Sequence, residues 1–195
     1  MSKRTKMKPE GRKQEIIDSA AILFKERGYS AVTMRDLARA MGIKAASLYN
    51  HIQSKQEILA SIIIDLAEHF TTGMNEIVKS DLTIIKKLEK IIELHIDITL
   101  TNADGLASLN NDWMHLEEEN LTYFEQMRHD YEENFRQIVR TGVNNGVLAN
   151  NNIEIIVFST LSTLRTLYLW YPKQRTIDPD ILKKDMITVL LKGII

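Results

Sequence analysis

Apolar residues recur at helical spacing along the whole chain, and this pattern restricts the fold more than any other feature. Ile16, Ala20, Leu23 and Phe24, for example, form a stripe spaced three and four residues apart. Only three prolines and eight glycines occur in 195 residues, mostly where helices should end. We find no convincing run of alternating strand residues. The sequence therefore predicts an all-α protein.

Residues that start and end helices divide this pattern into about nine predicted helices. Thr33 opens a short helix, and Gly42 separates it from the next one. Ser54 and Glu57 form a capping box that opens a long fourth helix. The helices are predicted at residues 9–27, 34–40, 44–52, 54–79, 82–100, 103–114, 120–141, 152–171 and from 178, with Asn120, Asn152 and Asp178 as the caps of the last three.

The formal net charge of −1 hides a strong asymmetry between two parts of the chain. Residues 1–55 carry twelve Lys and Arg against five Asp and Glu, whereas the other 140 residues carry thirteen against twenty-one. A basic end joined to an acidic body is typical of a module that binds a polyanion. A solvated basic tail is the alternative, because six of the positive charges lie in residues 1–13.

Residues 34–52 have the composition that a helix-turn-helix requires. Ala38 is the small residue that allows close crossing, and Gly42 tolerates the positive φ of the turn. The apolar residues that pin both helices to a core are Leu37, Met41, Ile43, Leu48 and Ile52. The outward side chains suit base edges and phosphates better than an ordinary helical corner does: Lys44, Ala46, Ser47 and Asn50, with Tyr49 and His51 on the flanks.

From residue 16 to residue 59 the chain resembles the DNA-binding domain of the tetracycline-repressor (TetR) family of bacterial transcription regulators. Lys44 departs from the family pattern, in which Ser or Thr usually caps the recognition helix, and Ile52 stands where Phe is usual. The residues that carry the resemblance are Ile17, Ala20, Leu23, Phe24, Gly28, Tyr29, Thr33, Leu37, Ala38, Gly42, Leu48, Tyr49, His51, Lys55 and Leu59.

The resemblance implies two groups of DNA-binding residues and a division into an N-terminal three-helix domain, 1–53, and a larger effector and dimerisation domain, 54–195. The residues expected at phosphates are Thr33, Tyr49, His51 and Lys55. Those expected at or beside base edges are Arg35, Lys44, Ala45, Ala46, Ser47 and Asn50, of which Arg35 can donate two hydrogen bonds to guanine. A basic arm, 1–8, could follow the adjacent DNA backbone through Lys3, Arg4, Lys6 and Lys8, or could be a tail of little function.

The predicted helix at 152–171 is apolar almost all round, so it must be covered on more than one side. In the family this helix and the last one pack against their mates as a four-helix bundle. The resemblance therefore implies a homodimer through the last two helices that reads a palindromic double-stranded operator. The alternative is a central helix in the core of a monomer.

The effector is expected to be small and hydrophobic. The stretch "DWMHLEEENLTYFEQMRHDYEENFRQIVRTGVNNGVL", followed by "WYPKQ", is similar to TetR regulators that respond to acyl-coenzyme A or related lipids. Any single lining candidate could also be an ordinary core residue. The candidates are Phe70, His95, Thr99, Leu109, Trp113, Tyr123, Met127, Tyr131 and Leu161.

Other functional classes receive less support from the sequence. Histidines and an aspartate at positions 95, 112, 115 and 129 have the chemistry for Zn or Ni, but no pair has i, i+4 spacing, and surface histidines explain them more simply. The motifs of phosphate loops, nucleophile elbows and zinc peptidases are missing. We therefore expect no metal, no cofactor and no enzymatic activity.

The chain has no cysteine and no stretch near 18 uninterrupted apolar residues, and its basic start leads into no apolar segment. A cytoplasmic location without membrane contact is expected. The sequence thus predicts a ligand-responsive repressor that its effector releases from the operator. Two alternatives stay open: a DNA-binding regulator without a ligand, and a helical lipid-binding or enzymatic protein with a vestigial DNA module.

Overall fold

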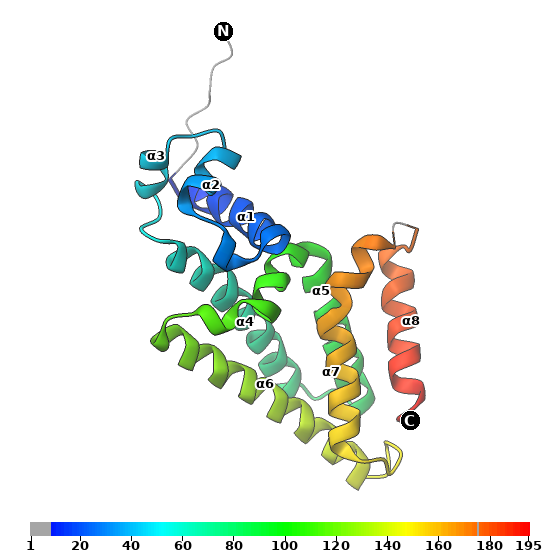
Figure 1. The fold of residues 1–195 in the computed structure, drawn as a ribbon. Helices are drawn as coiled ribbons and strands as arrows, with labels where there is room; N and C mark the ends of the chain where they lie inside the picture. Colours follow the sequence, from blue (N-terminus) through cyan, green and yellow to red (C-terminus); the bar gives the residue numbers. More distant parts are fainter. Residues whose placement is uncertain (1–8, 175) are drawn as a thin grey trace. The chain divides into compact units, whose positions relative to one another are not determined.

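The computed structural model describes residues 9–174 and 176–195, and within these ranges the regular structure is entirely helical (Figure 1). The predicted all-α fold is thereby confirmed. Eight α-helices and three short 3₁₀ helices occur in the described part: α1 (Pro9–Arg27), η1 (Tyr29–Ala31), α2 (Met34–Ala40), α3 (Ala45–Tyr49), α4 (Lys55–Lys79), α5 (Ile84–Asn111), η2 (Trp113–His115), α6 (Glu118–Asn144), α7 (Ile153–Trp170), η3 (Tyr171–Lys173) and α8 (Pro179–Lys192).

The helix count differs from the predicted nine because α5 joins two of the expected helices. The chain bends at Asn102, whose φ of −135° and ψ of 31° are not helical, yet it continues as helix on both sides. The Asn102 side chain donates to the hydroxyl of Thr101 at 2.8 Å. The helix therefore bends at Asn102 without ending, at the place where the sequence predicted the end of one helix and the start of the next.

Most of the predicted helix starts occur as expected. The side chain of Asn152 accepts hydrogen bonds from the backbone of residues 154 and 155, and Asp178 accepts one from residue 180. Ser54 accepts from the Glu57 backbone at 3.0 Å, but the Glu57 carboxylate reaches back to the N–H of residue 53 instead of that of Ser54. Asn120 is not a cap, because α6 already begins at Glu118.

The chain forms two compact units, and the first combines Met1–Leu66 with Asp104–Leu121. Its core contains Ile16, Phe24, Leu37, Leu48, Ile58 and Leu59, each at most 2% exposed. The end of α5 is tied to α1 by an ion pair in which Lys25 Nζ lies 2.8 Å from Asp104. No pattern in the sequence predicts that residues 104–121 belong with the N-terminal helices. The predicted functional boundary after residue 53 stays a prediction.

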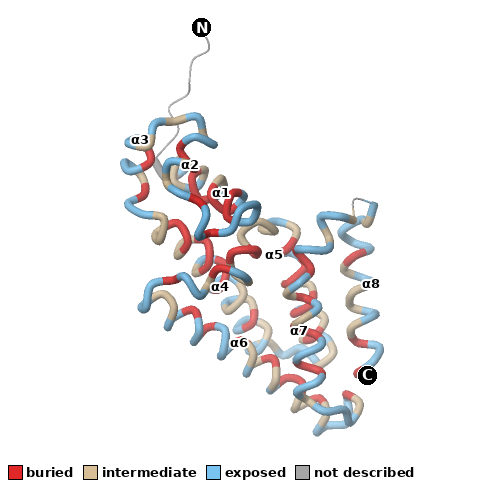
Figure 2. The backbone as a smooth tube through the Cα atoms, in the orientation of Figure 1, coloured by how far each residue is buried: buried red, intermediate tan, exposed pale blue. Residues whose placement is uncertain are grey.

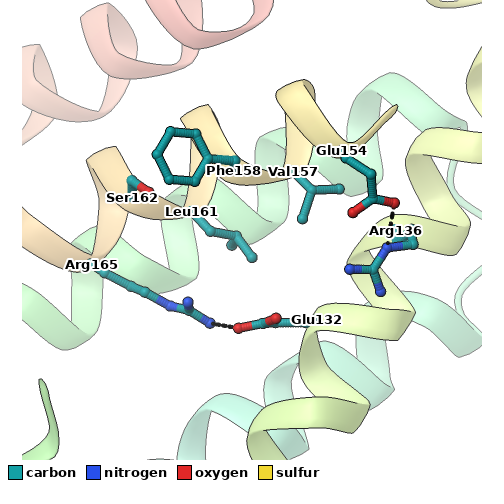
Figure 3. Close-up of a pocket in the computed structure, with 8 residues that line it drawn as sticks. All are labelled: Glu132, Arg136, Glu154, Val157, Phe158, Leu161, Ser162 and Arg165. Atoms are coloured by element: carbon teal, nitrogen blue, oxygen red, sulfur yellow. Dashed lines mark hydrogen bonds and ion pairs between the residues drawn. The ribbon is translucent and has the colours of Figure 1, made fainter. Parts of the chain in front are cut away.

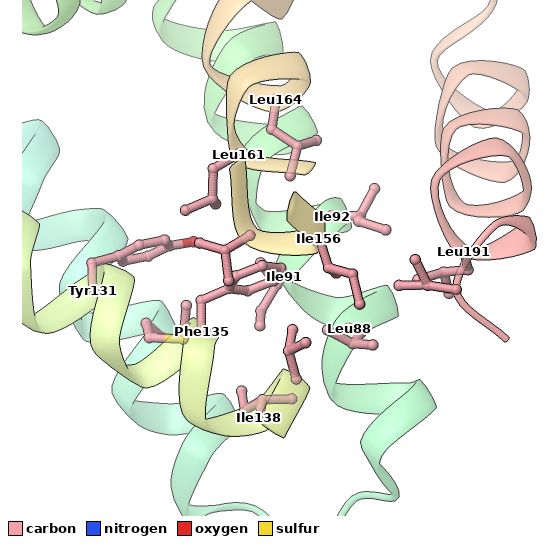
Figure 4. Packing of buried hydrophobic residues seen from close by; sticks show 14 of the residues in the cluster. Leu88, Ile91, Ile92, Tyr131, Phe135, Ile138, Ile156, Leu161, Leu164 and Leu191 are labelled. Carbon is pink, nitrogen blue, oxygen red and sulfur yellow. The ribbon is translucent and has the colours of Figure 1, made fainter. Parts of the chain in front are cut away.

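The second unit comprises Ala67–Ala103 and Thr122–Ile195. A continuous apolar core lies between its helices, and Figure 4 shows Phe135 and Ile138 of α6 beside Ile91 of α5 and Ile156 of α7. Gly142 allows this packing, because a Cβ there would lie 2.6 Å from the side chain of Leu148. The prediction that Gly142 and Gly146 end this helix is wrong for Gly142, which lies inside α6, and agrees with Gly146, which has a φ of 67° two residues after the last helical residue, Asn144.

Helix α7 with the residues directly after it, Ile153–Lys173, is long and apolar enough to cross a membrane by length and composition alone. One side of the helix is buried in the core of the second unit through Ile156, Leu161 and Leu164. Core helices pass the same test, so its composition is weak evidence for a membrane span. The opposite side of α7 exposes large apolar side chains such as Phe158.

Candidate nucleic-acid interface and effector region

The turn between α2 and α3 has helix-turn-helix geometry. Gly42 has a φ of 64°, a conformation that side-chain-bearing residues rarely adopt. The N–H of Ile43 donates to the carbonyl of Ala38 at 3.0 Å, which closes the turn against the small residue of α2. The local sequence therefore produces this turn through the glycine that was predicted to form it.

The start of α2 is fixed by a reciprocal pair of hydrogen bonds between Thr33 and Asp36. The Thr33 hydroxyl accepts from the Asp36 backbone at 3.2 Å, and the Thr33 N–H donates to the Asp36 carboxylate at 3.1 Å. The Thr33 hydroxyl also donates to the Asp36 carboxylate, and this bond, together with that of the Thr33 N–H, holds the pKa of Asp36 below its ordinary value. The cap places residues 33 and 35 on the exposed side of the first helical turn.

Helix α3 is anchored by buried apolar residues and presents a polar outer surface. Figure 2 shows α3 as mostly exposed with a short buried stretch. Leu48 is completely buried and Ile52 is 1% exposed, whereas Tyr49 is 54% exposed. Lys44 precedes the helix without forming a side-chain cap, as its departure from the family pattern suggested. Of the predicted DNA-binding residues, seven are exposed and Ala45, His51 and Lys55 are partly buried; the exposed ones are Thr33, Arg35, Lys44, Ala46, Ser47, Tyr49 and Asn50.

Lys55 has a different environment from the other predicted phosphate contacts. Its ammonium donates to the carbonyls of Tyr29 at 2.9 Å and Val32 at 2.8 Å, and lies 4.1 Å from the centroid of the Tyr29 ring. No pattern in the sequence predicts these internal bonds. The predicted basic arm, 1–8, with Lys3, Arg4, Lys6 and Lys8, lies outside the described residues.

Three predicted effector residues form an aromatic cluster inside the second unit. His95 Nε2 lies 2.9 Å from the hydroxyl of Tyr131, and the Phe70 and His95 ring centroids are 4.7 Å apart. Burial, helped by the charge of Arg165, lowers the pKa of His95 to about 3, so the imidazole is neutral. Thr99 donates to the His95 carbonyl at 2.8 Å. His95 is therefore a buried histidine, which agrees with its place among the predicted lining residues and not with the surface position considered for the metal candidates.

The other effector candidates do not share one environment. Met127 and Leu161 are buried in the second unit, whereas Tyr123 is 47% exposed and its hydroxyl donates to Glu68 at 3.1 Å. Leu109 and Trp113 belong to the first unit. The structure thus brings together part of the predicted lining set, centred on His95 and Tyr131.

A shallow open hollow lies on the second unit between α6 and α7 (Figure 3). Arg165 reaches Glu132 at 2.6 Å across its floor, and Arg136 reaches Glu154 at 2.9 Å near its end. It encloses about 180 Å³, less than the roughly 300–1,000 Å³ typical of small-molecule pockets. Among the predicted lining residues only Leu161 borders it; the complete lining is Glu132, Arg136, Glu154, Val157, Phe158, Leu161, Ser162 and Arg165.

Sequence reasoning missed the two arginines of this hollow. Arg165 is the one charged residue in the otherwise apolar or hydroxyl-bearing stretch 155–171, and this isolation was a usable signal. The four positions considered for a metal are dispersed: His95 lies in the second unit, Asp112 and His115 in the first, and His129 is exposed on α6. Within residues 9–174 and 176–195, no group of three or more potential metal ligands gathers.

Comparisons with known proteins agree with this architecture. Residues 16–62 match the family model described as bacterial regulatory proteins, tetR family, and residues 81–194 match the model of the tetracyclin repressor-like C-terminal domain. The HTH-type transcriptional repressor KstR2 of Rhodococcus jostii is 27% identical over 186 residues, which cover 94% of this chain and 91% of the relative.

Two solved structures illustrate the similarity of the fold. The ketosteroid transcriptional regulator KstR2 of Mycobacterium tuberculosis superposes with a TM-score of 0.87 at 20% identity, covering 94% of each chain. AibR in complex with isovaleryl coenzyme A and operator DNA superposes with a TM-score of 0.77 at 20% identity, covering 92% of this chain and 98% of the other. Both family models and the shared fold show that this chain belongs to the TetR family of bacterial transcriptional regulators.

Proposed function

We propose that this protein is a DNA-binding transcriptional repressor that acts as a homodimer and is released from its operator by a small hydrophobic effector. The observation that carries the proposal is the turn at Gly42, which leads into a helix with buried anchors and a small, polar and aromatic outer surface. Arg35 at the exposed start of α2 adds a donor suited to guanine. The repressors among its relatives support the direction of regulation.

Selection from a library of random duplexes tests the DNA-binding part of this proposal. The full-length protein should enrich a two-fold symmetric consensus, because a dimer presents two α3 helices to half-sites about 34–36 Å apart or a multiple of that distance. Arg35→Ala should relax the preference at one position of each half-site, at a cost of about 1–3 kcal/mol. Tyr49→Phe should weaken binding to all sequences alike. A protein that enriches no sequence would contradict the proposal.

The proposed dimer surface is the exposed side of α7 and α8. Phe158 is 73% exposed on α7 and Val189 is 70% exposed on α8, although both helices also contribute to the core of the second unit. Large apolar side chains gathered on two neighbouring helices are typical of a protein–protein interface. The other exposed apolar residues of these helices are Ile155, Leu169, Trp170 and Ile181.

Charge placed on this surface should separate the protomers. Val189→Asp should convert the dimer to a monomer in sedimentation experiments, since each interface would then bury two unpaired carboxylates. Val78→Asp is the matched control, because Val78 is an exposed valine of α4 in the same unit and lies outside the proposed surface. A wild-type protein that sediments as a monomer would refute the homodimer.

An acyl-coenzyme A thioester is the effector class that we propose. The support is the likeness of this fold to AibR, which has been solved with isovaleryl coenzyme A, and the aromatic cluster around His95 in the second unit. Isovaleryl coenzyme A and longer acyl thioesters should lower affinity for the selected duplex, and that duplex should lower affinity for the thioester by the same factor. Free coenzyme A is the control. If no thioester changed the affinity for the selected duplex, the protein would be a regulator that does not respond to this class of effector.

A further inference from the structure

Lys55, the first residue of α4, is bonded into the interior of the first unit. Two of the three N–H donors of its ammonium are used by the Tyr29 and Val32 carbonyls, at 2.9 and 2.8 Å. Its charge also lies over the Tyr29 ring, 4.1 Å from the centroid, a distance at which cation–π attraction operates. Tyr29 and Val32 are 6% and 2% exposed. The ammonium therefore closes a small internal joint that we call the Lys55 clamp.

The clamp acts on the segment that leads directly into α2. Val32, one of the two acceptors, precedes Thr33, whose side chain caps α2 through Asp36. The Val32 N–H donates in turn to the Tyr29 carbonyl at 3.2 Å, so the two clamped carbonyls belong to the first residue of η1 and to the residue that caps its end. The start of α4 is thus connected through one side chain to the position and direction of α2, which carries Arg35.

The groups that act on the charge of Lys55 also belong to the interior of the first unit. Partial burial lowers the pKa of Lys55, and the negative charge of Asp112 opposes this effect. Asp112 is only 9% exposed, and burial raises its pKa. An ammonium whose hydrogen bonds go to two backbone carbonyls and whose charge lies over an aromatic ring is poorly placed to serve mainly as a phosphate contact.

We propose that Lys55 is a positioning residue for sequence recognition, which holds the Tyr29–Thr33 segment so that α2 and its Arg35 lie correctly against α3, and that phosphate binding is not its main role. The inference rests on the DNA-binding function proposed above. It departs from the role that the family resemblance implied, in which Lys55 neutralises the DNA backbone beside Tyr49 and His51.

A matched pair of variants of the full-length protein separates positioning from phosphate binding. Lys55→Met keeps the aliphatic stem but removes the donors and the charge. Lys44→Met removes an exposed lysine beside α3 that forms no side-chain cap. Each variant is measured below its melting temperature against two probes, a duplex selected by the wild-type protein and a shuffled duplex of the same length, over a range of salt concentrations. Backbone amide exchange is followed without DNA.

Lys55→Met should reduce the ratio of affinities for the selected and shuffled duplexes by about tenfold while the salt dependence stays unchanged. The amides of Val32 and Asp36, whose acceptors lie in η1 and at Thr33, should exchange faster, whereas that of Leu148 in the second unit should not. Lys44→Met, which removes an exposed charge beside the recognition helix, should lower the salt slope by about 0.9 and leave the exchange of the Val32 and Asp36 amides unchanged. A slope lowered in Lys55→Met, with unchanged amide exchange, would overturn the proposal.

Lys55→Arg keeps the test decisive if Lys55→Met does not fold. Arginine retains the positive charge that a phosphate needs, but its planar fork cannot reproduce one compact ammonium beneath two carbonyls and over a ring. If Lys55 is a positioning residue, Lys55→Arg should discriminate less between the selected and shuffled duplexes, and its Val32 amide should exchange faster. If Lys55 mainly binds a phosphate, both measurements should match those of the wild type. If the wild-type protein selects no duplex, the DNA-binding function fails, but amide exchange in the same variants still tests the clamp.

Discussion

The two units of this protein are stabilised in different ways. In the second unit, eighteen buried residues form one apolar core, and the main polar feature within it is the pair of His95 and Tyr131. The first unit also has an apolar core, which includes Ile16 and Phe24, but its short helices are joined in addition by directional contacts at their starts and ends, such as the Thr33 cap, the Lys55 clamp and the ion pairs of Lys13 with Glu57 and Lys25 with Asp104. Directional contacts determine the orientation of a recognition surface, whereas an apolar core tolerates changes that conserve volume.

The comparison predicts that the largest stability loss comes from emptying the apolar core. Phe135 is 1% exposed in the centre of the second unit, so Phe135→Ala should lower the free energy of unfolding by about 3–5 kcal/mol. The two tryptophans allow each unit to be observed separately, because Trp113 belongs to the first unit and Trp170 to the second. Denaturation should be followed by Trp170 fluorescence in a Trp113→Phe background.

Tyr123→Ala is the control for this prediction, because Tyr123 is an aromatic residue of the same helix that is 47% exposed. It should change the free energy of unfolding by much less than Phe135→Ala does. Equal losses in the two variants would contradict the picture of a second unit that depends on its apolar core.

The buried histidine makes the second unit sensitive to acid. His95 has a pKa of about 3 in the folded protein and about 6.5 when unfolded, so between these values only the unfolded chain binds its proton. His95 therefore leaves the free energy of unfolding independent of pH above pH 6.5. Below pH 6.5 the free energy of unfolding falls by about 1.4 kcal/mol for each pH unit, because only the unfolded chain takes up the proton. Urea denaturation of the wild type and of His95→Gln should show this difference in slope.

His129→Gln, which replaces an exposed histidine of α6, should follow the wild-type curve. Parallel curves for the wild type and His95→Gln between pH 6.5 and pH 4 would mean that His95 takes up its proton in the folded state. The polar pair would then be open to water, and the contrast between the units would be weaker than the burial of His95 indicates.

A third change tests the directional character of the first unit. Gly42 has a φ of 64°, but a Cβ at this position would meet no atom within 4 Å. Gly42→Ala should therefore cost about 1–2 kcal/mol from backbone strain alone. Trp113 fluorescence in a Trp170→Phe background should report this loss. Gly11→Ala, at a helical position of α1 with open space around it, should be neutral or slightly stabilising.

The same contrast explains what could be predicted from the sequence. Thr33, Gly42, Asn152 and Asp178 act on backbone groups within a few residues of themselves, so their local chemistry is visible in the order of residues. Tertiary packing decided the features that were missed. The continuation of α5 past Asn102 and the membership of residues 104–121 in the first unit depend on distant partners.

The same limit applies to single functional residues. Lys55 bonds to carbonyls 23 and 26 residues away, so its internal partners could not be inferred from the helix that it begins. His95 lies 36 residues from the tyrosine that it contacts, so this partner could not be inferred from its own helix, although the spacing from Leu88 and Ile91 places His95 on an apolar face. The outer surface of α3 was easier to predict, because the short distance from Gly42 leaves few possible orientations for its side chains.

The smallest expected effect concerns the cap of α2. Thr33→Ala removes the hydroxyl that accepts the Asp36 N–H, and it should lower the free energy of unfolding by about 1 kcal/mol. Thr33→Ser keeps the hydroxyl and is the control. The Thr33 hydroxyl also donates to the Asp36 carboxylate and lowers its pKa, so the part of the cap that depends on this bond is present above the ordinary pKa of an aspartate and is lost as the pH falls through the folded pKa. The difference between the two variants, measured with Trp113, should therefore narrow in strong acid. If it stays constant with pH, the Asp36 carboxylate does not take part in the cap, and only the Thr33 hydroxyl fixes the start of α2.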